Sequence, residues 1–380
     1  MKILYITNFR IPTNKAHGYQ ICKMCEEFTK NGADVELLIP NKNKNQEDLF
    51  KYYEIEKNFQ VKIIKVFDAI FRYKFLGKLR YFLYDLIYLL YLLKEKINKN
   101  SIIYTRNPEI AWFFKIRGYK TIFEAHSWPN SKNLLYKFLL KKVDLIICNS
   151  HGTEKIYKIN NFKKIITAPN GVDLDKFKIK KDKKELKQEL EIPQDKNIIM
   201  YAGHLYEWKG IDIIIKIASE LREDKNIFFI IIGGLNSDVY KYKKICEVKK
   251  INNIKFLGYK NKKDIPSYLK TADILLLPNH PSTVESVKFT SPIKMFEYMA
   301  SNVPIVASDL PSIKEILNNN NSILVDPSNS NIFIKAINKI LNNKEFAKNI
   351  ANVACEDVKN YTWEKRAIKI LQKLNDIKQV

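Results

Sequence analysis

Short apolar runs alternate with amphipathic segments along the chain, and polar residues follow directly after most of the apolar runs. The first apolar run, at residues 2–7, is followed by a loop, a helix predicted over residues 19–30 and a second run at residues 35–39. Such runs, rich in Ile, Val and Leu, are typical of strands buried on both faces of a parallel sheet. The pattern therefore predicts a strand–helix–strand unit of the doubly wound type.

The same alternation continues through the rest of the chain. Further strands are predicted at residues 102–104, 121–123, 145–148, 165–167, 198–201, 227–232, 254–257, 274–277, 304–307 and 322–325. Two series of strands that alternate with helices predict an α/β fold of two facing Rossmann-like domains with a cleft between them. We expect the domains at residues 1–178 and 179–362, with a last helix at about 363–380 that packs back on the first domain.

The stretch from residue 290 to residue 300 carries a clear local signal. Ser291 is expected to cap a helix there, and Pro292 suits the first helical position, where a missing N–H costs nothing. The unpaired N–H groups at the start of such a helix form an anion site. Glu297 lies beside the apolar stripe, where a carboxylate needs a partner or the border of a cleft. Together these features suit a nucleotide, with phosphates at the helix start and ribose hydroxyls at Glu297.

Polar side chains also end the predicted strands of the first half, and they are Arg106, Glu124, His126, Ser150 and Asn170. In open parallel sheets the ligand lies beyond the carboxyl ends of the strands, so these groups collect where a ligand is expected. His126 taken alone is as readily a structural histidine as a functional one.

Two further turns are candidates for anion binding. Gly18 opens the first helix, where a glycine permits close approach of the backbone to a phosphate. Lys209 and Gly210 precede a helix predicted over residues 211–221, and they combine an ammonium with free backbone N–H groups. Each turn could equally be an ordinary one, since lysines are common throughout this chain.

Composition narrows the classes of function. The 380 residues carry a formal net charge of +24, which suggests anionic partners. The basic residues are dispersed and accompany no aromatic-basic motif, so nucleic acid is the weakest partner. The five scattered cysteines predict a reducing cytoplasm, and the spacing of Cys22 and Cys25 is interpreted as helix packing. The first apolar run is too short for a secretory signal.

Residues 81–93 form the most apolar stretch of the chain. This stretch is shorter than the roughly 20 residues that a bilayer span requires. A core helix is the favoured interpretation. The alternative is an amphipathic helix that touches an anionic membrane surface, because lysines and arginines flank the stretch on both sides. We therefore expect a cytoplasmic protein, with peripheral contact at the inner face of the cell membrane as the alternative.

The order of these motifs resembles that of the GT-B-fold retaining glycosyltransferases of group 1, also called family 4. The matching segments extend over nearly the whole chain, and they are His17-Gly18, Glu124-Ala125-His126, Pro169–Asp173, Tyr201–Leu205 with Lys209-Gly210, Gly233-Gly234, Phe256–Gly258 and Ser291–Ala300. The resemblance implies a UDP- or GDP-sugar donor bound mainly by the second domain and a glycan or lipid-linked acceptor bound by the first. It implies sugar transfer with retention, without a metal or cofactor, in the synthesis of cell-surface polysaccharide, lipopolysaccharide or glycolipid.

The resemblance also implies roles for individual residues. Glu297 matches the glutamate that accepts hydrogen bonds from ribose, and Lys209 matches the lysine that neutralises the diphosphate. Gly18 matches the glycine near that diphosphate, and His126 matches the histidine near the reacting sugar. His126, Lys209 and Glu297 are therefore the implied catalytic residues. The other implied donor-binding residues are Gly203, His204, Gly233, Gly258, Tyr259, Ser291, Ile293 and Lys294.

Two positions depart from the family pattern. His204 stands in for an arginine beside the diphosphate, and Phe289 replaces a glutamate that contacts the sugar. The backbone of Ser291 and Ile293, or the side chain of Lys294, would then contact the sugar instead. These departures leave open a catalytically impaired protein that binds a nucleotide sugar on the same fold. A nucleotide-sugar epimerase or phosphorylase is a further alternative.

Overall fold

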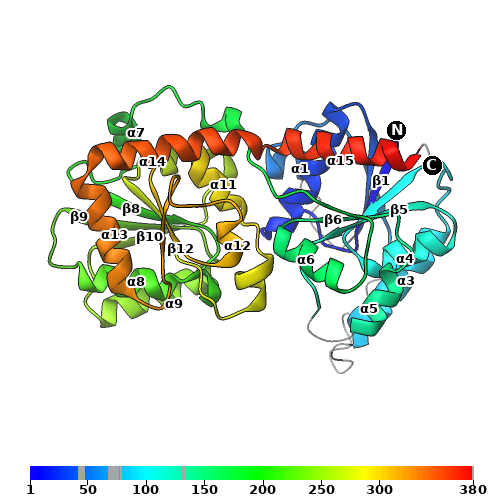
Figure 1. The fold of residues 1–380 in the computed structure, drawn as a ribbon, viewed down its shortest axis with the longest axis horizontal. Helices are drawn as coiled ribbons and strands as arrows, with labels where there is room; N and C mark the ends of the chain where they lie inside the picture. The colour runs from blue at the N-terminus through cyan, green and yellow to red at the C-terminus, as the bar shows by residue number, and fades with distance from the viewer. Residues whose placement is uncertain (42–47, 67–76, 78, 130–132, 379–380) are drawn as a thin grey trace. The chain divides into compact units, whose positions relative to one another are not determined.

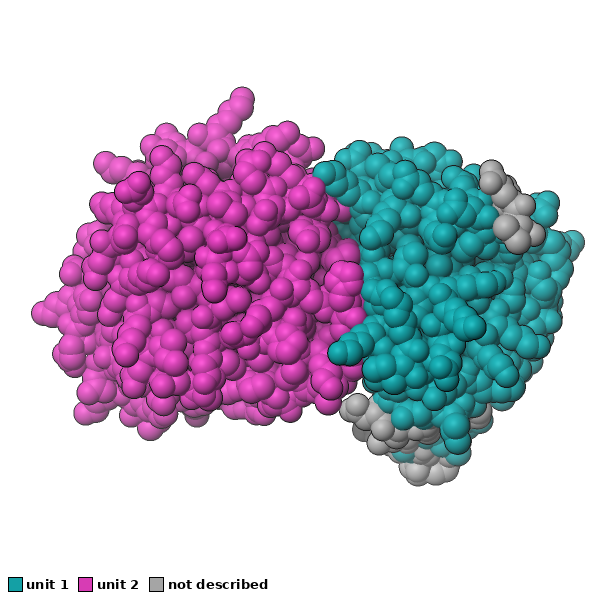
Figure 2. Space-filling view, in the orientation of Figure 1, with its two compact units in different colours: residues 1–149, 153–168, 363–380 teal, residues 150–152, 169–362 magenta. Residues whose placement is uncertain are grey.

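The computed structural model describes residues 1–41, 48–66, 77, 79–129 and 133–378. The chain forms two compact units (Figures 1 and 2). Unit 1 comprises residues 1–149, 153–168 and 363–380, and unit 2 comprises residues 150–152 and 169–362. Each unit is built around its own parallel sheet, so the predicted α/β class with two Rossmann-like units is confirmed.

Unit 1 contains a seven-stranded sheet with the order β3-β2-β1-β4-β5-β6-β7. The strands are β1 (Lys2–Ile6), β2 (Asp34–Pro40), β3 (Gln60–Ile64), β4 (Ile102–Thr105), β5 (Lys120–Ala125), β6 (Leu145–Cys148) and β7 (Ile165–Thr167). All the neighbouring pairs are parallel. The sequence pattern missed β3, because this edge strand is mostly exposed and Lys62 interrupts its apolar residues, so it lacks the apolar run of a buried strand.

The helices of this unit are α1 (Ala16–Lys30), α2 (Leu49–Tyr53), α3 (Leu79–Leu93), α4 (Pro108–Ile116), α5 (Asn133–Leu140), most of α6 (His151–Ile159) and α15 (Trp363–Lys378). The last helix, α15, lies along α1 (Figure 1). The ring of Trp363 meets the ring of Tyr19 edge-on, with the centroids 6.1 Å apart. The C-terminal helix is thus part of unit 1, although its sequence follows unit 2.

Helix α3 has two different apolar faces. Tyr84, Tyr88 and Leu92 are fully buried in the core of unit 1, as expected of a core helix. Leu86 and Leu90 lie on the other face and are 47% and 52% exposed. Within the described ranges of the chain, no helix is both long and apolar enough to cross a membrane.

Unit 2 contains a six-stranded parallel sheet with the order β10-β9-β8-β11-β12-β13. The strands are β8 (Asn197–Ala202), β9 (Ile227–Ile232), β10 (Ile254–Gly258), β11 (Ile274–Leu277), β12 (Ile305–Ser308) and β13 (Ile323–Val325). The helices are α7 (Lys183–Glu189), α8 (Ile211–Glu220), α9 (Asn236–Val248), α10 (Ile265–Lys270), α11 (Ile293–Ala300), α12 (Pro311–Lys314), α13 (Ser330–Asn342) and α14 (Lys344–Asp357).

Alternation along the strands of unit 2 fills an apolar core on each face of the sheet. On β8, Ile198 and Met200 belong to one core cluster, whereas Ile199 and Tyr201 belong to the other. Successive strand side chains point to opposite faces, so a fully apolar strand needs helices on both of them. The helices of unit 2 supply this cover, which leaves the loops at the strand ends as the place for polar function.

Candidate functional site

The loop after β8 presents Lys209 at the carboxyl edge of the unit 2 sheet. A short 3₁₀ turn (Glu207–Lys209) leads to Gly210, which has φ +77° and precedes α8. A side chain at Gly210 would overlap the carbonyl oxygen of Pro278, in the loop after β11. Only glycine fits this turn, so the position of Lys209 is set by the backbone. The Lys209 ammonium lies 3.6 Å from the centroid of the Trp208 ring.

Lys294, in the first turn of α11, carries a second amine, which is near enough to Lys209 for the charge of Lys209 to act on it. Its Nζ lies 3.8 Å from the centroid of the Tyr201 ring and has no hydrogen-bond partner within the described part of the chain. Gly203 borders this amine, because a Cβ at Gly203 would lie 3.5 Å from the Lys294 Nζ. The absence of a side chain at Gly203 thus leaves room beside the amine.

The pKa values of both lysines reflect this burial. Burial lowers the pKa of Lys209 to about 7. Burial, followed by the charge of Lys209, holds the pKa of Lys294 well below its ordinary value, although Glu297 acts in the opposite direction. A buried ammonium is unfavourable until an anion compensates it. The pair therefore suits an anionic ligand that carries more than one negative charge.

Glu297 lies one turn further along α11 and is buried. Its Oε1 accepts a hydrogen bond from the Nζ of Lys262, in the turn after β10. The next residue, Tyr298, accepts a hydrogen bond at its Oη from the Ala202 N–H, 2.8 Å away at the end of β8. This bond fixes α11 against the strand that leads to Lys209.

The prediction that Ser291 caps α11 was wrong. The helix begins at Ile293, Pro292 is its N-cap residue, and the described residues supply no side-chain cap. Ser291 Oγ instead accepts a hydrogen bond from the Asn170 backbone N–H at 3.2 Å, and its carbonyl oxygen accepts one from Asn170 Nδ2 at 2.6 Å. Asn170, in the Pro169–Asp173 motif, therefore fixes the entry to α11.

The remaining donor-binding candidates of unit 2 lie at the ends of neighbouring strands. Gly233 donates its N–H to the Gly258 carbonyl at 2.7 Å, and a Cβ on Gly233 would overlap the carbonyl oxygen of Gly203. Tyr259 follows Gly258 and is 56% exposed. The ring of His204 stacks on that of Tyr206, with the centroids 5.0 Å apart. The sequence named His204 as the second cation, whereas the structure couples the charge of Lys294 to that of Lys209.

A buried carboxylate organises the carboxyl edge of the unit 1 sheet. Glu124, at the end of β5, is fully buried. Its Oε1 accepts hydrogen bonds from Arg106 Nη2 at 2.8 Å and from Arg366 Nη2 at 2.7 Å, and its Oε2 accepts one from Tyr104 Oη at 2.8 Å. Burial alone would raise the pKa of Glu124, but the charges of the two arginines hold it well below its ordinary value. Glu124 is therefore an anion.

His126 contacts this cluster, with its Nε2 2.9 Å from Glu124 Oε1. Burial and then the charge of Arg106 lower the pKa of His126 to about 4, in spite of the opposing effect of Glu124. The same two causes lower the pKa of His17 to about 4. Both imidazoles are therefore neutral at neutral pH.

Gly18 follows His17 in the first turns of α1. A side chain at Gly18 would overlap the Oη of Tyr53, which accepts a hydrogen bond from the Thr13 N–H at 2.7 Å. The sequence suggested a phosphate as the reason for this glycine, and the structure adds the packing of Tyr53 as another.

Two important side chains received no role from the sequence. Arg366 lies on α15, three residues after the buried Trp363 and therefore on the same apolar face of the helix. A charged residue on such a face needs a buried partner, so the sequence could have indicated its role. Lys262 gave no comparable signal, because it is one of many lysines in a polar loop.

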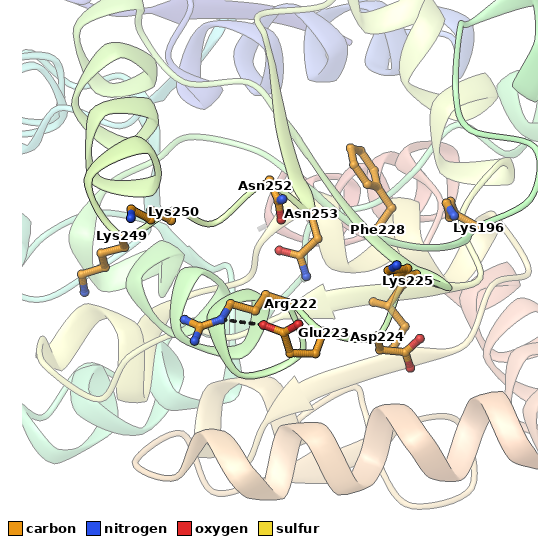
Figure 3. Close-up of a pocket in the computed structure, with 11 residues that line it drawn as sticks. Lys196, Arg222, Glu223, Asp224, Lys225, Phe228, Lys249, Lys250, Asn252 and Asn253 are labelled. Carbon is orange, nitrogen blue, oxygen red and sulfur yellow. Dashed lines mark hydrogen bonds and ion pairs between the residues drawn. The ribbon is translucent and has the colours of Figure 1, made fainter.

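Figure 3 shows a pocket elsewhere on unit 2, near the amino ends of β8, β9 and β10. Its basic side chains are mixed with carboxylates, and Arg222 pairs with Glu223 at 3.2 Å. Lys249 and Lys250 are exposed there, so their ammonium groups are hydrated. In the ranges that the structure describes, no group of three or more His, Cys, Asp or Glu side chains is arranged to hold a metal ion.

A parallel sheet with two desolvated lysine amines at its carboxyl edge has the construction of a nucleotide-binding α/β protein. The model for glycosyl transferases group 1 matches residues 182–357, and the model for Glycosyltransferase Family 4 matches residues 18–176. The chain belongs to the group 1 glycosyltransferases.

Individual relatives are distant. The uncharacterized glycosyltransferase MJ1607 of Methanocaldococcus jannaschii is 25% identical over 206 residues, which are 53% of this chain and 51% of that protein. The UDP-Gal:alpha-D-GlcNAc-diphosphoundecaprenol alpha-1,3-galactosyltransferase of Escherichia coli is 26% identical over 266 residues, which are 66% and 62% of the two chains. In both cases the chain spans less than two thirds of the relative's length.

Solved structures match over almost the whole chain. The sucrose-phosphate synthase of Thermosynechococcus elongatus matches with a TM-score of 0.78 at 16% identity. The match covers 99% of this chain and 98% of that chain. HepE of Anabaena in complex with UDP-glucose has a TM-score of 0.73 at 18% identity, with 99% of this chain and 100% of that chain covered. At such low identity these matches show the fold, which is that of GT-B glycosyltransferases.

Proposed function

We propose that this protein is a metal-independent retaining glycosyltransferase that moves a hexosyl group from a UDP- or GDP-sugar to a glycan or lipid-linked acceptor. The observation that carries the proposal is the pair of buried amines of Lys209 and Lys294, beside the start of α11 and one turn from Glu297. This set of groups suits a nucleoside diphosphate, because the two amines balance the two phosphates and the carboxylate accepts from ribose.

In the proposed reaction, the bond between the anomeric carbon and the diphosphate oxygen breaks, and a bond from the same face of that carbon to the acceptor oxygen forms. The acceptor hydroxyl passes its proton to the departing diphosphate. Negative charge therefore accumulates on the diphosphate in the transition state. In this proposal Lys209 and Lys294 stabilise it, together with the backbone N–H groups at the start of α11.

Lys294 takes the position of the second cation in this proposal. From the sequence, Lys294 was expected only to contact the sugar in place of the glutamate that Phe289 replaces. Its Nζ lacks a hydrogen-bond partner among the described residues, and its charge is coupled to that of Lys209. A desolvated amine of this kind is stabilised in its charged form by a phosphate, because the phosphate offsets the cost of its burial.

Glu297 is proposed to accept hydrogen bonds from the ribose hydroxyls. Lys262 already donates to its Oε1, so this lysine orients the carboxylate and lowers the charge that a diphosphate would meet nearby. The turn that carries Lys262 follows Gly258 and Tyr259, where the base is proposed to lie.

A lipid-linked acceptor at an anionic membrane is the finer proposal for the acceptor side. The E. coli relative is named for an acceptor on diphosphoundecaprenol. In unit 1, α3, α4 and α5 form one corner (Figure 1). Apolar side chains are exposed on all three helices. Leu134 and Phe138 on α5 are 83% and 60% exposed, and exposed Lys141 and Lys142 follow this helix directly. Exposed apolar groups beside lysines suit an anionic bilayer surface.

The deciding experiment measures release of UDP or GDP from a panel of nucleotide sugars, with glycan and lipid extracts as acceptors. We expect turnover by the native protein and its loss in Lys209→Ala and Glu297→Ala, whereas Lys249→Ala, an exposed lysine of the pocket in Figure 3, remains active. Donor binding without turnover of any donor would refute catalysis and favour the impaired binding protein. Conversion of the donor without transfer to an acceptor would favour an epimerase.

A further inference from the structure

Glu124 is compensated by more positive charge than a single carboxylate requires. Arg106 and Arg366 both donate to its Oε1, and Tyr104 donates to its Oε2. All of these side chains are buried, and the two guanidinium groups outnumber the one carboxylate. A third positive charge in the same cluster is therefore unfavourable.

Arg366 reaches this cluster from the far end of the sequence. Its Nε donates to the carbonyl oxygen of Ala168, just after β7, at 3.1 Å, and its Nη2 donates to Glu124. Arg106 is held in a similar way, because its Nη1 donates to Gln20 Oε1 on α1 at 2.8 Å. Both guanidinium groups are thus oriented by other elements of unit 1 before they reach Glu124.

The protonation state of His126 follows from these contacts. The groups that face it are Glu124 on β5, Arg106 after β4, Arg366 on α15 and His17 on α1. An ionised carboxylate can only accept, so the His126 Nε2 that lies 2.9 Å from Glu124 must carry the hydrogen. In a neutral ring the other nitrogen, Nδ1, then has a lone pair and no proton.

We propose that Arg366 is a positioning residue for His126: with Arg106 it keeps Glu124 ionised, and Glu124 fixes His126 as the neutral tautomer with its proton on Nε2. The Nδ1 of His126 then serves as a hydrogen-bond acceptor for a hydroxyl group. The side chain of His126 is 28% exposed, so a ligand can reach it.

The use of Nδ1 rests on the proposed function and on the implied place of His126 near the reacting sugar, where Nδ1 meets a hydroxyl group of the acceptor. A neutral acceptor nitrogen favours a ligand with a hydroxyl at that position over the deoxy or O-methyl analogue. C-terminal helix α15 thereby takes part in the site of unit 1 through Arg366, which touches no substrate itself.

The tautomer can be measured in ligand-free protein labelled with ¹⁵N-histidine, with the His126 signals assigned by their loss in His126→Asn. We expect the shifts of a neutral ring protonated at Nε2, unchanged from pH 8 to about pH 5. A ring protonated at Nδ1, or titration near pH 6.5, would overturn the proposal. This measurement needs no turnover, so its failure is separate from failure of the proposed function.

The role of Arg366 is tested with Arg366→Gln, with Arg366→Lys as the conservative variant and Lys369→Gln as an exposed control on the same helix. Removal of one positive charge should raise the pKa of His126, by up to about one unit, seen by NMR and as an equal shift of the acidic limb of kcat/KM. The lysine variant should restore most of the native profile, and Lys369→Gln should match the native protein. An unshifted His126 in folded Arg366→Gln would refute the role. If that variant does not fold, Arg366→Met, which also removes the charge, is measured in its place, and an unshifted His126 there would refute the role equally.

Discussion

Binding of a nucleoside diphosphate should be accompanied by uptake of protons from solution, because the pKa values of Lys209 and Lys294 are lowered in the free protein. Burial lowers the pKa of Lys209 to about 7, so about a tenth of it is charged at pH 8 in the free protein. A bound diphosphate favours the charged amine and should return its pKa to the ordinary range. Lys209 alone then takes up about 0.9 proton at pH 8.

Lys294 adds to this uptake, since its pKa is lowered by burial and by the charge of Lys209. The two amines together should take up between about 0.9 and about 2 protons at pH 8, and Lys209 should contribute only about 0.1 at pH 6. The sign follows from the lowered pKa: the free protein binds fewer protons than the complex above pH 7. The dissociation constant should therefore rise about tenfold per pH unit for each proton taken up.

Calorimetric titration of UDP or GDP in buffers with different ionisation enthalpies measures the number of protons directly. Lys209→Met and Lys294→Met should each reduce the uptake and weaken binding, whereas Lys249→Met, an exposed lysine, should change neither. The free nucleoside, which lacks the phosphates, should give no uptake. Tight binding of the diphosphate with no proton uptake at pH 8, or with the same uptake in both lysine variants, would refute the reasoning.

Three further outcomes follow from the structure. Gly210→Ala should lower the free energy of unfolding by about 2 to 4 kcal/mol in denaturant titrations, because φ is positive there and the new Cβ overlaps a carbonyl oxygen. The control Gly118→Ala, where φ is also positive but the space is open, should lower it by only about 1 kcal/mol. Glu124→Gln should cost about 3 to 5 kcal/mol in the same assay, since it leaves two buried arginines without an anion, and a smaller loss would show that the cluster is hydrated. Leu134→Asp should weaken co-sedimentation with anionic vesicles about tenfold, and Val248→Asp, equally exposed on unit 2, should not; equal effects would argue against the membrane surface.

The strands of both sheets were largely readable from the sequence, because strands buried on both faces leave apolar runs that end at polar residues. The predicted strand at residues 145–148, for example, coincides with β6 (Leu145–Cys148). The edge strand β3 was missed because it is mostly exposed and Lys62 interrupts its apolar residues, which leaves no such run. Pattern reading succeeds where burial dictates residue type and fails where solvent allows any residue.

The candidate sites were predictable only in part. Glu297 was conspicuous because it is a carboxylate on an apolar helix, and the structure gives it the partner Lys262. The prediction that Ser291 caps α11 was wrong, since local capping statistics say nothing of a contact with a residue 121 positions away. There Asn170 donates to the Oγ and to the carbonyl oxygen of Ser291. The coupling of Lys294 to Lys209 is likewise a property of the folded sheet edge, and no spacing along the chain reveals it.

The two units use opposite electrostatic arrangements, and this difference predicts different responses to pH. In unit 2 the amines of Lys209 and Lys294 are buried without a compensating anion of equal charge, so the ligand must complete the cluster. In unit 1 the charge of Glu124 is already more than compensated, so the cluster around His126 is complete before any ligand arrives. Donor affinity should therefore decline above pH 7 as the lysines lose their protons. The His126 contact should remain unchanged down to about pH 5. We therefore expect kcat/KM for the donor to fall above about pH 7 and to show no acidic limb between pH 7 and about pH 5.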